Sequence, residues 1–315
     1  MSDLLWTPFP YFGTKHAIAD VVWERLGNVD SYVEPCCGSC AVLLGRPSPG
    51  RFETVNDVDG LLVNALRGLK HEPTNVAEWA NHEIWEPDLH AAHAWLVQEK
   101  AGLVSKLEAD LEYHDAKMAG LWIWGMCTYI GAGFCSGEGP WHVQDGKMVK
   151  GAEPGLGINK KLPGLGGERG ANTAHLDEKL RWFAALSKRF KNVRIACGDW
   201  SRVVGPTITW QLGVCGVVID PPYEDFTGVY NEANNIVTEI NQWANESGNN
   251  PLMRIVLCGY EGEYNLPDTW DCVSWTAHHG YGAQRTDGTK NENKTKERIW
   301  FSPHCLKPQP ELFKL

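Results

Sequence analysis

The chain has 315 residues, of which 43% are hydrophobic and 22% are charged, and its net charge is −10. This length and composition suit one large domain or two smaller ones, and they exclude disordered, collagen-like and coiled-coil proteins. Ten acids against two lysines give residues 71–115 a charge of −8, which leaves −2 for the rest. A nucleic-acid partner is therefore compatible with the charge, provided that it avoids residues 71–115.

The ten cysteines indicate neither a disulfide framework nor a metal site. The N-terminus lacks a basic segment followed by an apolar run, so we expect no secretory signal, and cytoplasmic thiols stay reduced. Cys37 and Cys40 form the one CxxC, and no second CxxC or histidine pair accompanies it, so no metal is expected. The apolar stretch 119–134 is broken by glycines and is too short to span a bilayer, so no membrane association is expected.

Helix and strand patterns alternate through the first 70 residues. The expected elements are a helix over 15–26, a strand over 31–34, a helix through 42–44, a strand over 52–55 and a helix over 59–69. Pro35 ends the first strand, and Ser39 is expected to cap the helix that follows. This alternation is typical of the start of a doubly wound α/β sheet.

The pattern changes over residues 71–190 and then returns to α/β. The middle of the chain is expected to be helical over 74–130, a loop region over 131–174 and helical again over 175–190. The expected later elements are strands over 193–197 and 214–219, a helix over 232–245, and strands over 254–258, 273–277 and 298–302.

The chemically most informative segment is Asp220-Pro221-Pro222-Tyr223, which directly follows an apolar strand. The carboxyl end of a strand in an open sheet is where ligands bind. Two prolines fix the backbone, so the Pro221 carbonyl and the Asp220 carboxylate can each accept one hydrogen of an amino group. Tyr223 offers a flat face on which a planar ring can stack. The alternative interpretation is a rigid turn with a capping aspartate.

The motifs, taken in order, resemble those of the D12-class, Dam-like DNA adenine N6-methyltransferases, particularly the phage-type members. The matching segments are Pro8-Phe9-Pro10-Tyr11-Phe12-Gly13-Thr14-Lys15, Tyr32-Val33-Glu34-Pro35-Cys36-Cys37-Gly38-Ser39-Cys40-Ala41-Val42, Asn56-Asp57-Val58-Asp59, Gly198-Asp199-Trp200, Asp220-Pro221-Pro222-Tyr223 and Glu297-Arg298-Ile299-Trp300-Phe301-Ser302-Pro303. The resemblance covers residues 8–69 and 193–302. Residues 71–190 match only in placement, where the family carries its target-recognition insertion.

The resemblance implies an α/β fold, with a Rossmann-like S-adenosylmethionine-dependent methyltransferase sheet and a helical and loop target-recognition insertion. The catalytic domain would comprise residues 1–70 and 191–315, and the insertion residues 71–190. The implied reaction is methyl transfer from S-adenosyl-L-methionine to N6 of an adenine that is flipped out of double-stranded DNA. The implied location is the cytoplasm of a bacterial or phage-infected cell.

The resemblance also assigns the site. The implied catalytic residues are Asp220, Pro221, Pro222 and Tyr223. The implied cofactor-binding residues are Tyr11, Phe12, Gly13, Lys15, Glu34, Pro35, Cys36, Gly38, Asp57, Val58, Asp199, Trp200 and Asp220. The chain departs from the family pattern at Cys36, where phenylalanine is usual, and at Cys40, which replaces the second glycine of its motif.

Several of these side chains have a simpler alternative role. Asp57 can accept both ribose hydroxyls of a nucleoside cofactor, or it can cap the helix over 59–69. Lys15 can reach the cofactor carboxylate, or it is a solvated lysine. Glu34 binds at the site, or it only orients the loop that follows it. Asp199 accepts from an adenine amino group, or it is a turn residue.

Residues 141–170 and 285–298 each carry a net charge of +2. The candidate nucleic-acid-binding residues are Lys147, Lys150, Lys160, Lys161, Arg169 and Arg285; the alternative for both segments is a solvated loop. The runner-up functions are methylation of cytosine N4, methylation of adenine in RNA, and a non-catalytic DNA- or cofactor-binding relative. A nicotinamide dehydrogenase is disfavoured because no GxGxxG follows the first strand.

Overall fold

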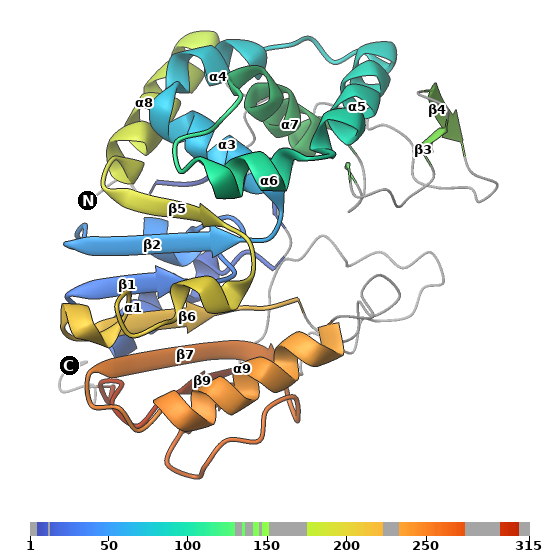
Figure 1. The fold of residues 1–315 in the computed structure, drawn as a ribbon. Helices are drawn as coiled ribbons and strands as arrows, with labels where there is room; N and C mark the ends of the chain where they lie inside the picture. The colour runs from blue at the N-terminus through green and yellow to red at the C-terminus, as the bar shows by residue number, and fades with distance from the viewer. Residues whose placement is uncertain are drawn as a thin grey trace, which may run out of the picture. The chain divides into compact units, whose positions relative to one another are not determined.

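The computed structural model describes residues 5–11, 13–129, 134–135, 141–144, 147–150, 175–222, 233–274 and 297–308. Within these ranges helices alternate along the chain with strands that form a seven-stranded sheet (Figure 1). The strand order in the sheet is β5-β2-β1-β6-β7-β9-β8. Its strands are β1 (Ser31–Glu34), β2 (Phe52–Asp57), β5 (Val193–Cys197), β6 (Cys215–Ile219), β7 (Met253–Tyr260), β8 (Asp271–Ser274) and β9 (Glu297–Phe301). The α/β class is therefore confirmed.

The sheet is mixed and mostly parallel. β1 pairs in parallel with β2 and β6, and β6 pairs in parallel with β7. β9 runs antiparallel to both β7 and β8. In chain order, β2 and β5 lie on one side of β1, whereas β6 and β7 lie on the other. The direction in which successive strands are added to the sheet thus reverses between β1 and β6. Open α/β sheets bind ligands at such a reversal.

The chain forms two compact units, which are Met1–Thr14 with Asn56–Asp199, and Lys15–Val55 with Trp200–Leu315. We call them the helical unit and the sheet unit. The expected partition into a catalytic domain of residues 1–70 and 191–315 and an insertion at 71–190 stays a prediction.

The sheet unit surrounds its parallel strands with helices. These are η1 (His16–Ile18), α1 (Ala19–Leu26), α2 (Ala41–Leu44), η3 (Trp200–Val203), η4 (Trp210–Leu212) and α9 (Ala233–Ser247). β1 and β6 are buried along their whole length, as strands of a parallel sheet covered on both faces are. Arg25 of α1 lies 4.3 Å from the ring centroid of Phe301, so α1 packs directly on β9.

Six helices make up most of the described part of the helical unit. They are α3 (Gly60–His71), α4 (Pro73–Trp79), α5 (Glu86–Lys100), α6 (Leu103–Ala109), α7 (Ala116–Thr128) and α8 (Leu176–Phe190). Figure 1 shows α3, α4, α7 and α8 packed against one another. Gly120 of α7 permits this close approach, since a Cβ there would lie 2.3 Å from the Cβ of Trp79. The helices expected over 74–130 and 175–190 are confirmed.

One expectation for this region was wrong. Residues 131–174 were expected to be a loop region, but β3 (Trp141–Gln144) and β4 (Lys147–Lys150) form an antiparallel hairpin within it. Strands of four residues around a two-residue connection are too short to give a visible alternation of apolar and polar residues. Periodicity therefore could not separate them from the glycine-rich sequence around them.

Arg67 holds three parts of the helical unit together from α3. Its side chain is almost fully buried, and its Nε donates to the carbonyl of Ile195 at 3.0 Å. Its Nη1 donates to the carbonyls of Leu107, Asp110 and Tyr113 at 3.1, 2.8 and 3.3 Å. Burial lowers the pKa of Arg67, but the guanidinium stays charged. One cation thereby joins α3 to β5 and to the C-terminal end of α6.

We expect Arg67→Met to lower the free energy of unfolding by about 3 kcal/mol, because it leaves several buried carbonyls without a donor. Urea denaturation measures the change. The matched control is Arg181→Met on the exposed face of α8, which should change the stability by less than about 0.5 kcal/mol. Equal effects of the two substitutions would contradict the role given to Arg67.

His93 is a titratable group inside an aromatic cluster. Its side chain, on α5, is buried, and its ring centroid lies 5.2 Å from that of Phe134 and 6.0 Å from that of Tyr129. Burial, with the charge of His90 as a smaller cause, lowers the pKa of His93 to about 4. The folded protein thus takes up this proton only near pH 4, whereas the unfolded chain takes it up near pH 6.5.

His93 should therefore make the protein less stable as the pH falls from about 6.5 to about 4, because the unfolded state binds the proton first. We expect His93→Leu to flatten the curve of stability against pH over that interval. Urea midpoints at pH 7 and pH 4.5 test this for both proteins. An unchanged difference between the two midpoints would show that another group causes the loss.

Candidate functional site

Asp220 and Lys15 form an ion pair at the carboxyl end of β6. Asp220 directly follows the strand, and its Oδ2 lies 2.8 Å from the Nζ of Lys15, which precedes η1. The two side chains are 21% and 8% exposed. Burial alone would lower the pKa of Lys15, but the Asp220 carboxylate, with smaller contributions from Cys258 and Glu297, raises it above the ordinary value. Lys15 is therefore not the solvated lysine of the alternative interpretation.

The rest of the Asp-Pro-Pro-Tyr segment is described only in part. Pro221 is buried and Pro222 is exposed. Tyr223 lies outside the described residues. Of the groups expected to bind the substrate amino group, the structure therefore describes the Asp220 carboxylate, with its partner Lys15, and the backbone of Pro221.

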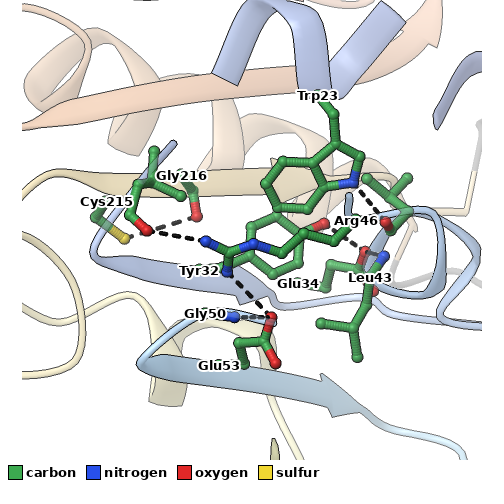
Figure 2. Close-up of polar contacts among 11 residues, drawn as sticks. Trp23, Tyr32, Glu34, Leu43, Arg46, Gly50, Glu53, Cys215 and Gly216 are labelled. Atoms are coloured by element: carbon green, nitrogen blue, oxygen red, sulfur yellow. Dashed lines mark hydrogen bonds and ion pairs between the residues drawn. The ribbon is translucent and has the colours of Figure 1, made fainter. Parts of the chain in front are cut away.

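Glu34, at the end of β1, connects the strand to the helix that follows. Its Oε1 accepts a hydrogen bond from the Tyr32 hydroxyl at 2.5 Å and one from the Leu43 amide at 2.8 Å (Figure 2). Burial first, and then the Glu34 carboxylate, raises the pKa of Tyr32 well above its usual value, so its hydroxyl stays a donor. These contacts are those of a residue that orients a loop, and cofactor binding by Glu34 stays a prediction.

The N-cap predicted for α2 was wrong. Ser39 was expected to cap α2, but the N-cap position is Cys40, whose side chain makes no capping hydrogen bond. The Glu34 carboxylate satisfies the Leu43 amide in the first turn instead. The cap therefore comes from the preceding strand and not from the adjacent residue.

The loop between β1 and α2 contains two left-handed residues. Gly38 has φ 46° and Cys40 has φ 53°. Glycine adopts this conformation readily, whereas cysteine does so at a cost of about 1–2 kcal/mol. Cys36 is partly exposed, and Cys37 and Cys40 are buried. All ten cysteines of the chain lie in described ranges, and none of them forms a disulfide.

A buried polar cluster contacts α2 and the residues that follow it (Figure 2). The indole Nε1 of Trp23 donates to the carbonyl of Val42 at 2.6 Å. Arg46 forms a buried ion pair with Glu53 at 3.0 Å, and its guanidinium carbon lies 4.9 Å from the ring centroid of Trp23. The sequence analysis missed Arg46 and Glu53. Their signal was a charged residue on each side of the loop that leads into β2.

The helical unit contains two further acids, Asp57 and Asp199, that the sequence predicts to bind the cofactor. Asp57 ends β2, and its Oδ1 accepts from the amide of Asp59 at 3.0 Å. The cap of α3 is Asp59, which accepts from the amide of Leu61, so the alternative role of Asp57 as that cap was wrong. The Asp57 carbonyl accepts from the amide of Gly198 at 3.0 Å, next to the exposed Asp199.

Asn56 also holds Gly198, because its Nδ2 donates to the Gly198 carbonyl at 2.8 Å. Asp57 and the Gly198-Asp199 turn are thereby brought together within the helical unit. Val58 is 70% exposed. Tyr11 is partly buried, with its ring centroid 6.5 Å from that of Phe9, and Gly13 has φ 65°.

The remaining predicted residues are placed as follows. Pro35 is buried, and Trp200 is buried at the start of η3 in the sheet unit. Lys147 and Lys150 belong to β4, but their side chains lie outside the described part of the chain. The predicted residues that lie wholly outside the described ranges are Phe12, Tyr223, Lys160, Lys161, Arg169 and Arg285.

Over the described ranges, no group of three or more histidine, cysteine, aspartate or glutamate side chains is arranged to hold a metal ion. None of the helices there combines the length and the apolar character that crossing a bilayer requires.

Comparison with known proteins leaves the family open. No protein-family model matches the chain, and no curated protein matches it. The methyltransferase family thus stays a resemblance of motifs, and the activity of the chain is a proposal.

The strained position of Cys40 can be tested with two substitutions that both remove its buried thiol. Cys40→Gly relieves the left-handed backbone, whereas Cys40→Ala keeps it strained. We expect the glycine variant to be more stable than the alanine variant by about 1 kcal/mol in urea denaturation. Equal stability of the two variants would mean that residue 40 does not hold φ near 53° in solution.

Proposed function

We propose that the chain is an S-adenosylmethionine-dependent methyltransferase that acts on N6 of adenine in DNA. The observation that carries the proposal is the ion pair of the buried Lys15 with the half-buried Asp220, at the carboxyl end of a strand beside the reversal point of the sheet. A carboxylate held at that point, followed by two prolines, suits recognition of an exocyclic amino group.

The proposed cofactor fits the chemistry of the residues available. A positively charged, buried Lys15 is suited to a carboxylate, and the left-handed Gly38 gives a ligand close access to the backbone after β1. The motif resemblance assigns the ribose hydroxyls to Asp57, a carboxylate at the end of β2. When bound, S-adenosylmethionine supplies an electrophilic methyl group on its sulfonium.

The residues of the chain would position the amino group that receives the methyl. The Asp220 carboxylate and the Pro221 carbonyl each accept one amino hydrogen, which draws the nitrogen lone pair out of conjugation with the ring. Bound S-adenosylmethionine would supply the methyl group that this lone pair receives, and Asp220 would take the amino proton that is lost and pass it to water. Positioning and electrostatics supply the rate enhancement.

Lys15 has a further role in this proposal. Its ammonium lies 2.8 Å from the Oδ2 of Asp220 and so restrains the orientation of the carboxylate. An ammonium this close also favours the ionised carboxylate, the form that can accept an amino hydrogen. Lys15 is thus a positioning residue for Asp220.

The DNA would bind to a surface that does not include the acidic helices. α5 and its neighbours fall within residues 71–115, whose charge of −8 repels phosphates. Positive charge is available in residues 141–170 and 285–298, and we propose that these segments contact the duplex. Residues 141–170 lie within residues 71–190, where the family carries its recognition insertion.

The role of Asp220 is best tested together with Lys15. Asp220→Asn should lower methyl transfer at least about tenfold, which corresponds to about 1.4 kcal/mol of transition-state stabilisation. It should also lower the stability, because it removes the charge with which the buried ammonium of Lys15 is paired. The double variant Lys15→Met/Asp220→Asn should recover part of the stability and none of the activity.

Tritium transfer from labelled S-adenosylmethionine and urea denaturation provide the two measurements. A double variant that regains activity along with stability would reduce Asp220 to a structural residue. The substrates are DNA, DNA without adenine, and RNA, which separate adenine N6 from cytosine N4 and from an RNA target. Cofactor binding by calorimetry without transfer to any of them would identify a non-catalytic relative.

A further inference from the structure

A cavity of about 350 Å³ in the sheet unit takes no part in the proposed reaction. Its lining includes Trp200, Val204, Pro206, Trp210, Trp243 and Met253. Met253 begins β7 and pairs with Cys215, the first residue of β6, whereas Asp220 follows the last. The cavity thus reaches the opposite end of β6 from Asp220, about 17 Å along the strand.

Two of its tryptophans form a right-angled corner. The ring centroids of Trp200 and Trp243 lie 6.0 Å apart, and their planes meet at 82°. Trp200 is buried in η3, so its indole is held in place, and Trp243 projects from α9. A flat ring placed in such a corner stacks on one indole and points its edge at the face of the other, which are the two favourable aromatic geometries.

The lining is uncharged. Its described residues include the hydroxyl groups of Ser201 and Ser247 and no aspartate, glutamate, lysine, arginine or histidine. A charged ligand would lose its hydration here without gaining a countercharge. The walls therefore suit a neutral molecule with an apolar face and a polar edge.

We infer that this cavity binds a neutral, planar heteroaromatic molecule of one or two fused rings, in the corner of Trp200 and Trp243. The volume lies at the lower end of the range for small-molecule pockets, which suits a ligand of that size. The site is independent of the Lys15–Asp220 pair and of the activity proposed for it.

Gly205 provides a matched pair of test variants. It lines the cavity, and a Cβ added to it would meet no atom within 4 Å. Gly205→Phe should therefore fill the cavity without displacing the backbone, whereas Gly205→Ala leaves most of the space. Trp243→Leu removes one wall of the corner, and Trp243→Phe keeps an aromatic face.

Purine is the probe, because it is neutral, planar and lacks an amino group that Asp220 could bind. Indole N–H signals in ¹⁵N NMR, assigned by single Trp→Phe variants, report where it binds. We expect shifts at Trp200, Trp210 and Trp243. Gly205→Phe should weaken binding at least about tenfold and Trp243→Leu about fivefold, whereas Gly205→Ala should change it by less than about twofold.

The proposal is overturned if millimolar purine shifts none of these three signals, or if Gly205→Phe binds purine like the unaltered protein. Should Gly205→Phe fail to fold, equal affinity of Trp243→Leu and Trp243→Phe overturns it as well. Asp220→Asn should bind purine normally. Loss of binding in that variant would place the purine at the candidate active site and not in this cavity.

Discussion

The parallel pairing of β1 with β6 is the constraint on which the candidate site depends. Ser31, Tyr32 and Val33 lie opposite Cys215, Gly216 and Val217, so the two strands start level and end at the same edge. Glu34 and Asp220 emerge there although they are far apart in the sequence. Each then holds a neighbouring segment in place. Glu34 accepts a hydrogen bond from the Leu43 amide in the first turn of α2, and Asp220 forms an ion pair with Lys15.

Buried basic side chains recur in both units, and their charges are compensated in two ways. Lys15 and Arg46 have carboxylate partners, whereas Arg67 is held by main-chain carbonyls. Such groups add little net stability, because desolvation offsets most of the attraction, but removing one partner is costly. Their contribution is to fix the arrangement of loops and helix ends around strands that apolar burial alone would leave less defined.

The strands and most helices could be predicted from the sequence because their burial is periodic or complete. β6 is an unbroken apolar run followed by Asp220, β1 is a buried strand followed by Pro35, and β2 ends at Asp57. The cap of α2 could not be predicted, because its acceptor, Glu34, belongs to another element. The same holds for Lys15 and Asp220, which were each expected at the site but whose pairing depends on the folded sheet.

The way in which the sheet unit is divided along the chain has a consequence for its synthesis. Lys15–Val55, with β1, leaves the ribosome well before Trp200–Leu315, which supplies β6. Residues Asn56–Asp199 of the helical unit are complete in between. Pairings over such long separations form slowly, and an unpaired apolar strand promotes aggregation. During translation the edge of β1 that pairs with β6 therefore stays unpaired until β6 has been synthesised. Chaperones can protect a nascent chain from aggregating in such a state.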